Sequence, residues 1–145
     1  MEIKLSDTQK TKELAFKLAQ KIVPGMIFML YGDLGSGKTT FVRYVVESLG
    51  ISSRVQSPTF VIVRKYSDES AKGQIKQVFH VDLYRLNDKE QIMDLGLSEM
   101  AEEENSVMFI EWPELVENEF KNGIRIYFET TGETERVVKL EDKYV

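Results

Sequence analysis

The chain has 145 residues, of which 42% are hydrophobic, so it is long and apolar enough for one domain with a full core, which excludes a disordered tail. It contains no cysteine, which excludes disulfides, thiolate catalysis and cysteine-ligated metal centres. With 19 basic and 24 acidic residues its net charge is −5, which argues against broad, independent binding to nucleic acid.

Four elements are expected in the first third of the chain. Capping residues followed by apolar residues at four-residue spacing predict helices, whereas short alternating or continuously apolar runs predict strands. In chain order, these elements are a strand at Glu2–Leu5, a helix at Thr8–Ile22, a strand at Met26–Tyr31 and a helix at Lys38–Leu49.

Five more strands, separated by short helices and turns, are expected in the rest of the chain. Runs of β-branched and aromatic residues indicate the strands, and polar or glycine-containing stretches such as Ser67–Gly73 indicate turns. The expected strands are Phe60–Lys65, Gln77–Asp82, Val107–Glu111, Ile124–Thr130 and Arg136–Leu140. The expected short helices are Asn87–Leu95, Ser98–Glu104 and Pro113–Phe120. Residues 131–134, Thr-Gly-Glu-Thr, favour a hairpin turn between the last two strands.

A phosphate-binding motif lies between the second strand and the helix that follows it. Residues 32–39 match G-x-x-x-x-G-K-[ST] at every specified position. Its glycines let backbone N–H groups turn toward a phosphate, and the N-terminus of the next helix adds further donors. We expect Lys38 to reach the β- and γ-phosphates of ATP and Thr39 to bind Mg²⁺. The expected nucleotide-binding residues are Gly32, Asp33, Leu34, Gly35, Ser36, Gly37, Lys38, Thr39 and Thr40.

The order of the elements, together with this motif, predicts an α/β fold in one domain over residues 1–145. Strands and helices alternate in the first two thirds of the chain, which favours a mostly parallel sheet. We therefore expect the three-layer sandwich of P-loop NTPases, with an antiparallel hairpin at the C-terminal end.

Two apolar strands end in an acidic residue, Asp82 and Glu111. The carboxyl ends of parallel strands border the ligand site of an open sheet, and a P-loop enzyme needs a carboxylate near its magnesium ion. We expect Asp82 to hold Mg²⁺, directly or through water. Glu111 is a further candidate ligand and, with Lys38, a candidate catalytic residue that orients or deprotonates the attacking water. The alternative is that either acid only caps a turn.

Two aromatic residues lie beside these acids. His80, the only histidine, precedes Asp82 by two residues, and a packed or supporting role is favoured over a catalytic one. Trp112 follows Glu111 directly and is expected to be a packing residue, with contact to a partner as the second interpretation.

No segment predicts contact with a membrane. The start of the chain, MEIKLSDTQKTKELAF, lacks the apolar run of a secretory signal, and the longest apolar run is far too short to span a bilayer. We therefore expect a cytoplasmic protein.

Five ordered blocks, spread over nearly the whole chain, resemble the TsaE (also called YjeE) family of small bacterial P-loop ATPases. The blocks are residues 32–41 (GDLGSGKTTF), 57–60 (SPTF), 80–86 (HVDLYRL), 96–99 (GLSE) and 111–114 (EWPE). The chain departs from the family pattern at Ser36, where Ala is common, and at Tyr44, where Gly is frequent.

The resemblance implies a role in making the threonylcarbamoyl modification on adenosine 37 of tRNAs that read ANN codons. It implies slow ATP hydrolysis that supports a complex with TsaD and TsaB, with tRNA contacted mainly through these partners. It also implies that Thr59 contacts Mg²⁺ or the γ-phosphate and that the base lies near Ser6–Thr11. Arg85 could pair with an acid, contact phosphate or face a partner. The C-terminal hairpin and Glu99–Asn105 are candidate docking surfaces.

Other P-loop functions remain as alternatives. A small-molecule kinase usually needs an arginine-bearing lid, but arginine is sparse after Asp82. A GTPase typically needs an Asn-Lys-x-Asp element, and residues 87–90 have these residue types in the wrong order. A nucleotide-dependent binding module without significant turnover is the nearest competitor.

Overall fold

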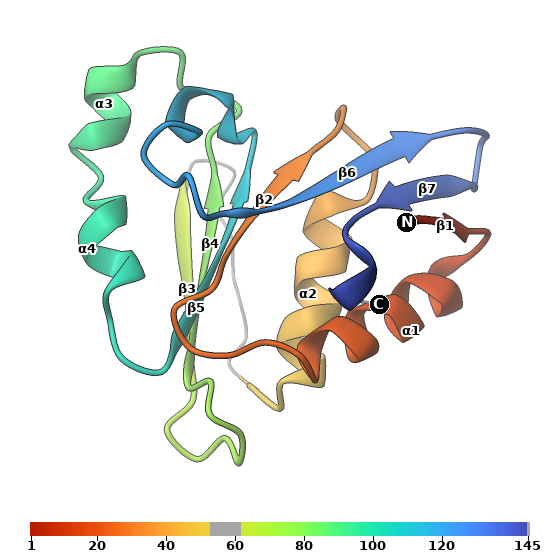
Figure 1. Ribbon diagram of the computed structural model, residues 1–145, viewed down its shortest axis with the longest axis horizontal. Coiled ribbons are helices and arrows are strands. Elements are labelled where there is room, and N and C mark those ends of the chain that lie inside the picture. The colour runs from red at the N-terminus through yellow and green to blue at the C-terminus, as the bar shows by residue number, and fades with distance from the viewer. Residues whose placement is uncertain (53–61, 145) are drawn as a thin grey trace.

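The computed structural model describes residues 1–52 and 62–144, and these residues form a seven-stranded sheet in the order β1-β7-β6-β2-β5-β4-β3 (Figure 1). The strands are β1 (Glu2–Leu5), β2 (Ile27–Tyr31), β3 (Val63–Ser67), β4 (Gln77–Asp82), β5 (Ser106–Glu111), β6 (Ile124–Thr130) and β7 (Arg136–Lys139). The helices are α1 (Thr8–Ala19), α2 (Lys38–Ser48), α3 (Lys89–Met93) and α4 (Leu97–Ala101), with short 3₁₀ helices η1 (Pro113–Val116) and η2 (Asp142–Tyr144). Among the described residues, no helix has the length and apolar character that a bilayer span requires.

The centre of the sheet is parallel and its two edges are antiparallel. Strands β6, β2, β5 and β4 pair in parallel, whereas β3 pairs antiparallel with β4 at one edge. At the other edge β6 and β7 form the expected antiparallel hairpin, and β1 adds to β7 in antiparallel register. The expectation of a mostly parallel sheet is thus confirmed for the centre.

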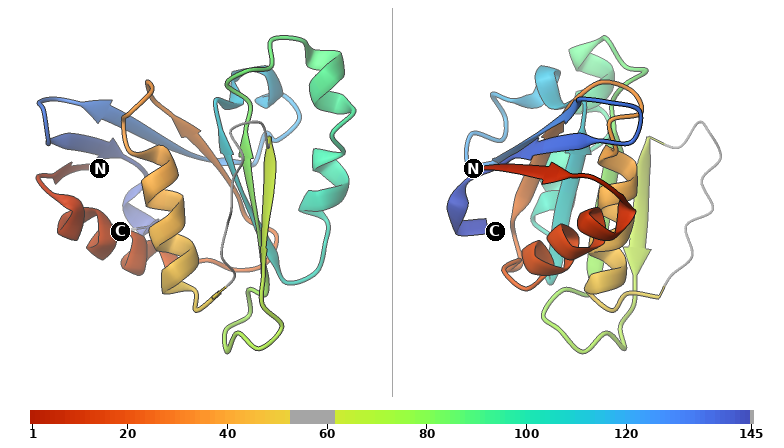
Figure 2. Two further views of the ribbon diagram at one scale, coloured as in Figure 1. Left: turned by 180° about the vertical axis from the view of Figure 1, so that it is seen from behind. Right: turned by 90° about the vertical axis from the view of Figure 1, so that its right-hand side faces the viewer.

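Helices cover both faces of the sheet, so the expected three-layer α/β arrangement is confirmed (Figure 2). On one face, Leu18 of α1 and Val42 of α2 belong to the same buried cluster as side chains of β2 and β5. On the other face, Ile92 of α3 and Leu97 of α4 are buried together with residues of β4 and β5. Apolar residues at helical spacing on the helices and at alternate strand positions produce these two cores.

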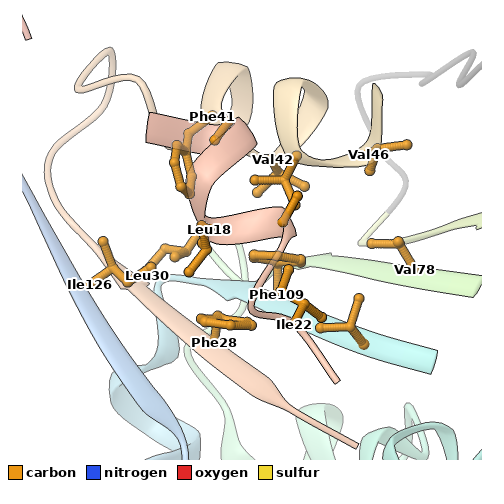
Figure 3. Packing of buried hydrophobic residues seen from close by; sticks show 14 of the residues in the cluster. Leu18, Ile22, Phe28, Leu30, Phe41, Val42, Val46, Val78, Phe109 and Ile126 are labelled. Carbon is orange, nitrogen blue, oxygen red and sulfur yellow. The ribbon is translucent and has the colours of Figure 1, made fainter. Parts of the chain in front are cut away.

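Two stacked aromatic rings join β2, which precedes the phosphate-binding motif, to β5, which ends at Glu111. Phe28 of β2 and Phe109 of β5 are fully buried, with ring centroids 4.9 Å apart and planes inclined by 11° (Figure 3). In the same ladder Leu30 pairs with Glu111, and Glu111 pairs with Asp82 of β4. The end of β2, where the phosphate-binding motif begins, is therefore at the same level of the sheet as both acids.

Several element boundaries differ from those expected. The first helix ends at Ala19 instead of Ile22, because Gln20 caps it and residues 21–25 turn toward β2. In place of the expected strand Phe60–Lys65, the structure has a strand at Val63–Ser67. The first two residues of the expected strand lie outside the described part of the chain. By contrast, the bounds of Gln77–Asp82 and Ile124–Thr130 match the expectation.

Candidate nucleotide-binding site

The loop between β2 and α2 depends on glycine at two positions. A Cβ atom at Gly32 would lie 2.6 Å from the carbonyl oxygen of Phe128 and 2.7 Å from Ser36 Oγ, so a side chain there would clash with β6. Gly37, immediately before α2, has φ 99°, which L-residues rarely adopt. These two positions let the backbone make a tight turn into the helix.

The first turn of α2 supplies backbone donors. The N–H of Phe41 donates to the Gly37 carbonyl at 2.9 Å, so the N–H groups of residues 38–40 precede the first bond of the helix. Such N–H groups at a helix start have no acceptor within the helix and can bind an anion. The loop therefore has the backbone arrangement that binds phosphate.

A cavity of about 200 Å³ lies over this turn. It brings together most of the residues expected from the sequence, including both strand-end acids. Its lining is residues 34–40 with Asp82, Glu111 and Trp112. Gly32 and Asp33 lie beside the cavity, and the Asp33 carbonyl accepts a hydrogen bond from the Ser36 N–H at 3.1 Å, which closes the loop.

Lys38 is buried at the wall of this cavity. Its ammonium group donates to the Gly32 carbonyl and lies 3.9 Å from the centroid of the Trp112 ring, in cation–π geometry. Burial lowers the pKa of Lys38 from its ordinary value, and the negative charges of Glu111 and Asp82 oppose that shift. The Lys38 side chain thus forms part of the cavity wall and carries a positive charge there.

Trp112 is more than the packing residue expected from the sequence. It lines the cavity, holds the Lys38 ammonium against its ring and packs on Tyr84, with ring centroids 5.0 Å apart. Its φ of 57° is uncommon for a residue with a side chain and turns the chain sharply after β5. The only sequence signal was its place directly after a strand-end acid.

Glu111 is the centre of the polar contacts in the site. Its carboxylate accepts the Thr39 hydroxyl, at 2.8 Å to Oε2, and lies 2.5 Å from His80 Nε2. Burial by itself raises the pKa of Glu111, but the hydrogen bonds from His80 and Thr39 and the Lys38 charge outweigh it, so the pKa is lowered. Glu111 is therefore held as a carboxylate although only 3% of its surface is exposed.

Asp82 is half-buried at the end of the neighbouring strand. Its Oδ1 accepts the N–H of Tyr84 at 3.0 Å, so it caps the turn after β4. The same side chain lines the cavity. The turn-capping interpretation of Asp82 is thus confirmed, and its role toward Mg²⁺ stays a prediction.

The oxygen atoms around the cavity fit a magnesium ion. The Thr39 hydroxyl and the carboxylates of Glu111 and Asp82 are hard oxygen ligands, and Mg²⁺ usually takes one or two protein carboxylates together with substrate phosphates and water. Within residues 1–52 and 62–144, no group of three or more His, Asp or Glu side chains forms a metal site of its own.

A second cavity, of about 190 Å³, adjoins the first. Residues 35–37 and Thr40 line both cavities. The rest of the second lining comes from the end of β1, the start of α1 and the C-terminal hairpin, including Thr8, Phe128 and Arg136. Arg136 Nη2 donates to the Gly35 carbonyl at 3.1 Å. No local sequence pattern marks Arg136 or Phe128 as part of the site, because only the fold brings the hairpin to the loop.

Two other positions singled out in the sequence, Arg85 and Tyr44, are absent from the linings of both cavities, and a third lies outside the described part of the chain. Thr59 and its block 57–60 are outside the described residues. Arg85 is exposed and is not part of the lining of either cavity. Tyr44 of α2 faces α1, where the Lys12 ammonium lies 5.3 Å from the centroid of its ring, so this departure from the family pattern affects helix packing.

The chain is similar to known proteins over most of its length. The sequence model of a family described as "Threonylcarbamoyl adenosine biosynthesis protein TsaE" matches residues 5–138. A Bacillus subtilis protein named tRNA threonylcarbamoyladenosine biosynthesis protein TsaE is 36% identical over 131 residues, which are 90% of this chain and 78% of that protein. A Synechocystis protein of the same name is 38% identical over 117 residues, or 79% of this chain and 71% of that protein.

A Rickettsia felis protein of the same name is 36% identical over 115 residues; these are 79% of this chain but 63% of that protein, so the chain spans less than two thirds of its length. Among solved structures, Bacillus subtilis YdiB matches with a TM-score of 0.74 and 28% identity, covering 99% of this chain and 88% of that one. The chain belongs to the TsaE family, whose proteins are named for tRNA threonylcarbamoyladenosine biosynthesis.

Proposed function

We propose that this protein binds ATP with Mg²⁺ in the cavity over the P-loop and hydrolyses it slowly, as a subunit of the complex that forms N6-threonylcarbamoyladenosine at tRNA position 37. One observation carries the proposal: Lys38, Thr39 and the strand-end carboxylates Asp82 and Glu111 line a single cavity over a phosphate-binding turn. Family membership supports the pathway.

The two adjoining cavities suggest how the nucleotide lies. The phosphates would bind residues 34–40, where backbone donors and the Lys38 ammonium converge. The nucleoside would extend into the second cavity, beside Thr8, Thr11 and Arg136. The expectation that the base lies near Ser6–Thr11 agrees with this direction, because the start of α1 forms one wall.

Binding would change the contacts of Lys38 and would use the carboxylates. The ammonium would leave the Gly32 carbonyl and the Trp112 ring for the β- and γ-phosphates. Bound Mg²⁺ would neutralise charge on the phosphates, held near Thr39 and Asp82. Glu111 would orient or deprotonate the water that attacks the γ-phosphorus, and ADP and phosphate would be released. Its hydrogen bond to Thr39 also supports a place for Glu111 beside the metal.

The proposed partners are homologues of TsaD and TsaB in the cytoplasm. The net charge of −5 is unfavourable for direct binding to an RNA backbone, so contact with tRNA would come mainly through these partners. Slow hydrolysis by the isolated protein is expected, since many P-loop proteins need a partner to complete their site.

Hydrolysis of ATP with Mg²⁺, measured with and without a purified TsaB–TsaD pair, tests this proposal. The Lys38→Ala variant is the blank, and Lys17→Ala, an exposed lysine of α1, is the matched control. We expect the pair to stimulate wild type and Lys17→Ala but not Lys38→Ala. Absence of stimulation would remove the assignment to the complex, and a screen of phosphate acceptors with labelled ATP would then test the kinase alternative.

The two acids should separate in the same assay. Asp82→Ala should weaken Mg²⁺-dependent ATP binding, whereas Glu111→Ala should preserve binding and abolish turnover. Normal hydrolysis by both variants would show that these roles are wrong.

A further inference from the structure

The only histidine of the chain is buried behind the site, where it cannot reach a nucleotide. His80 is 2% exposed and lies on β4, with its Nε2 atom 2.5 Å from Glu111 Oε2. It is absent from the linings of both cavities over the P-loop. Among the described residues, the side-chain contact that links His80 to the site is therefore the one with Glu111.

His80 lies between an apolar and a charged neighbour. It shares the core face of β4 with the fully buried Val78, and its ladder partners are Phe109 of β5 and the half-buried Arg64 of β3. Its other ring nitrogen, Nδ1, is buried and has no hydrogen-bond partner among residues 1–52 and 62–144. A partly satisfied polar side chain is costly in a core, and an apolar residue of similar size would avoid that cost. The contact with Glu111 is the compensating feature.

We propose that His80 is a positioning residue that fixes the Glu111 carboxylate for nucleotide hydrolysis; this rests on the proposed function. An ionised carboxylate can only accept, so Nε2 carries the proton and donates it to Oε2. The same carboxylate accepts the single hydroxyl hydrogen of Thr39. His80 from β4 and Thr39 from α2 thereby fix the orientation of the Glu111 carboxylate.

This arrangement also orients Thr39. Because its hydroxyl hydrogen is directed to Glu111, its oxygen can serve the cavity only through lone pairs, as a ligand to a cation requires. His80 holds the acceptor that enforces this direction. Supporting hydrogen bonds of this kind, when removed, commonly reduce activity by roughly 10- to 100-fold.

The test compares three substitutions of His80 in the 145-residue chain, with ATP hydrolysis measured in the presence of the TsaB–TsaD pair and ATP binding measured separately. His80→Gln can place an amide N–H near the former Nε2 and should retain most of kcat. His80→Asn, which is shorter, and His80→Leu, which has no donor, should lower kcat by roughly 10- to 100-fold, with a smaller rise in the Kd for ATP because Thr39 is also less well oriented. Val78→Ala, on the same face of β4, is the control for loss of core packing and should keep kcat.

Each outcome decides the proposal. Equal kcat values for His80→Asn, His80→Gln and wild type would overturn it, as would a parallel loss in Val78→Ala, which would indicate a packing role. If His80→Leu does not fold, the comparison of Asn with Gln still decides. A wild-type rate no higher than that of Lys38→Ala would overturn the proposed hydrolysis and this inference together, whereas normal hydrolysis by all His80 variants would overturn the inference alone.

Discussion

The centre of the sheet and its C-terminal edge use charge in opposite ways. At the centre, Lys38, His80 and Glu111 are each at most 4% exposed and contact one another or the groups beside them. At the edge, Lys139 of β7 is half-exposed and lies 3.4 Å from a Glu2 oxygen and 3.9 Å from a Glu129 oxygen. Solvent screens the edge pairs but not the central ones. Removing a central group should therefore alter function, and removing an edge charge should do little.

The edge nevertheless reaches the site at two points. The Phe128 carbonyl oxygen would lie only 2.6 Å from a Cβ atom at Gly32. Arg136 donates a hydrogen bond to the Gly35 carbonyl. The hairpin thus acts as a backbone wall for the P-loop, although its own ion pairs contribute little. The predictions below test this division, from the largest expected effect to the smallest.

The largest effect on stability is expected from the ring stack at the centre. Phe109→Ala should lower the free energy of unfolding by about 3–5 kcal/mol, because the ring is fully buried against Phe28 and leaves a cavity. Urea unfolding measures this loss. Phe16→Ala, with the ring 54% exposed on α1, should change it by less than about 0.5 kcal/mol. Similar losses in both variants would contradict the placement of the core.

The wall formed by the hairpin is tested at Gly32. The added Cβ of Gly32→Ala meets a backbone oxygen that cannot rotate away, so overpacking should cost about 1–3 kcal/mol beyond the conformational cost of replacing glycine, and ATP affinity should fall. Gly25→Ala is the control, because Gly25 has φ 93° but open space around it. Equal unfolding free energies for the two variants would show that β6 does not press on the loop.

The buried carboxylate should give the centre an acid-dependent contribution to stability. The pKa of Glu111 is lowered because the hydrogen bonds from His80 and Thr39 and the Lys38 charge outweigh its burial, so its contribution is complete above its ordinary pKa of 4.5. As the pH falls below 4.5 and through the lower folded pKa, that contribution is lost. The free energy of unfolding, measured with urea, should therefore fall more steeply with decreasing pH in wild type than in Glu111→Gln. Parallel curves would contradict the pKa direction.

The smallest effect is expected at the edge. Lys139→Met should change the free energy of unfolding by less than about 1 kcal/mol, since both of its ion pairs are exposed. Added salt should shrink even this difference. A larger loss that persists in high salt would mean that the edge strands depend on charge after all.

The sequence predicts the features of the fold and the site that depend on local residue patterns. The bounds of Gln77–Asp82 and Ile124–Thr130, the P-loop and the two strand-end acids follow from local residue patterns. These patterns extend over a few residues, so the sequence alone shows where an apolar strand ends in a polar residue.

Contacts between distant segments could not be predicted. The antiparallel pairing of β1 with β7 joins opposite ends of the chain. The approach of Arg136 to Gly35 follows from the pairing of β6 with β2 and with β7, which also joins distant segments. The triangle of Thr39, Glu111 and His80 depends on the ladder register between β4 and β5 and on the docking of α2, neither of which is encoded locally. The contact of the Lys38 ammonium with the Trp112 ring depends on the positive φ of Trp112, and nothing in the sequence predicts a positive φ at a tryptophan.

Calorimetric titration of the protein with ATP tests the central claim, that the cavity over the P-loop is a site for Mg²⁺ and nucleotide. We predict one site per chain, weakened when Mg²⁺ is removed and weakened by roughly 10- to 100-fold in Lys38→Ala, as expected for a charged hydrogen bond worth about 1.5–3 kcal/mol. Binding that is equally tight in Lys38→Ala, or that does not depend on Mg²⁺, would contradict the account.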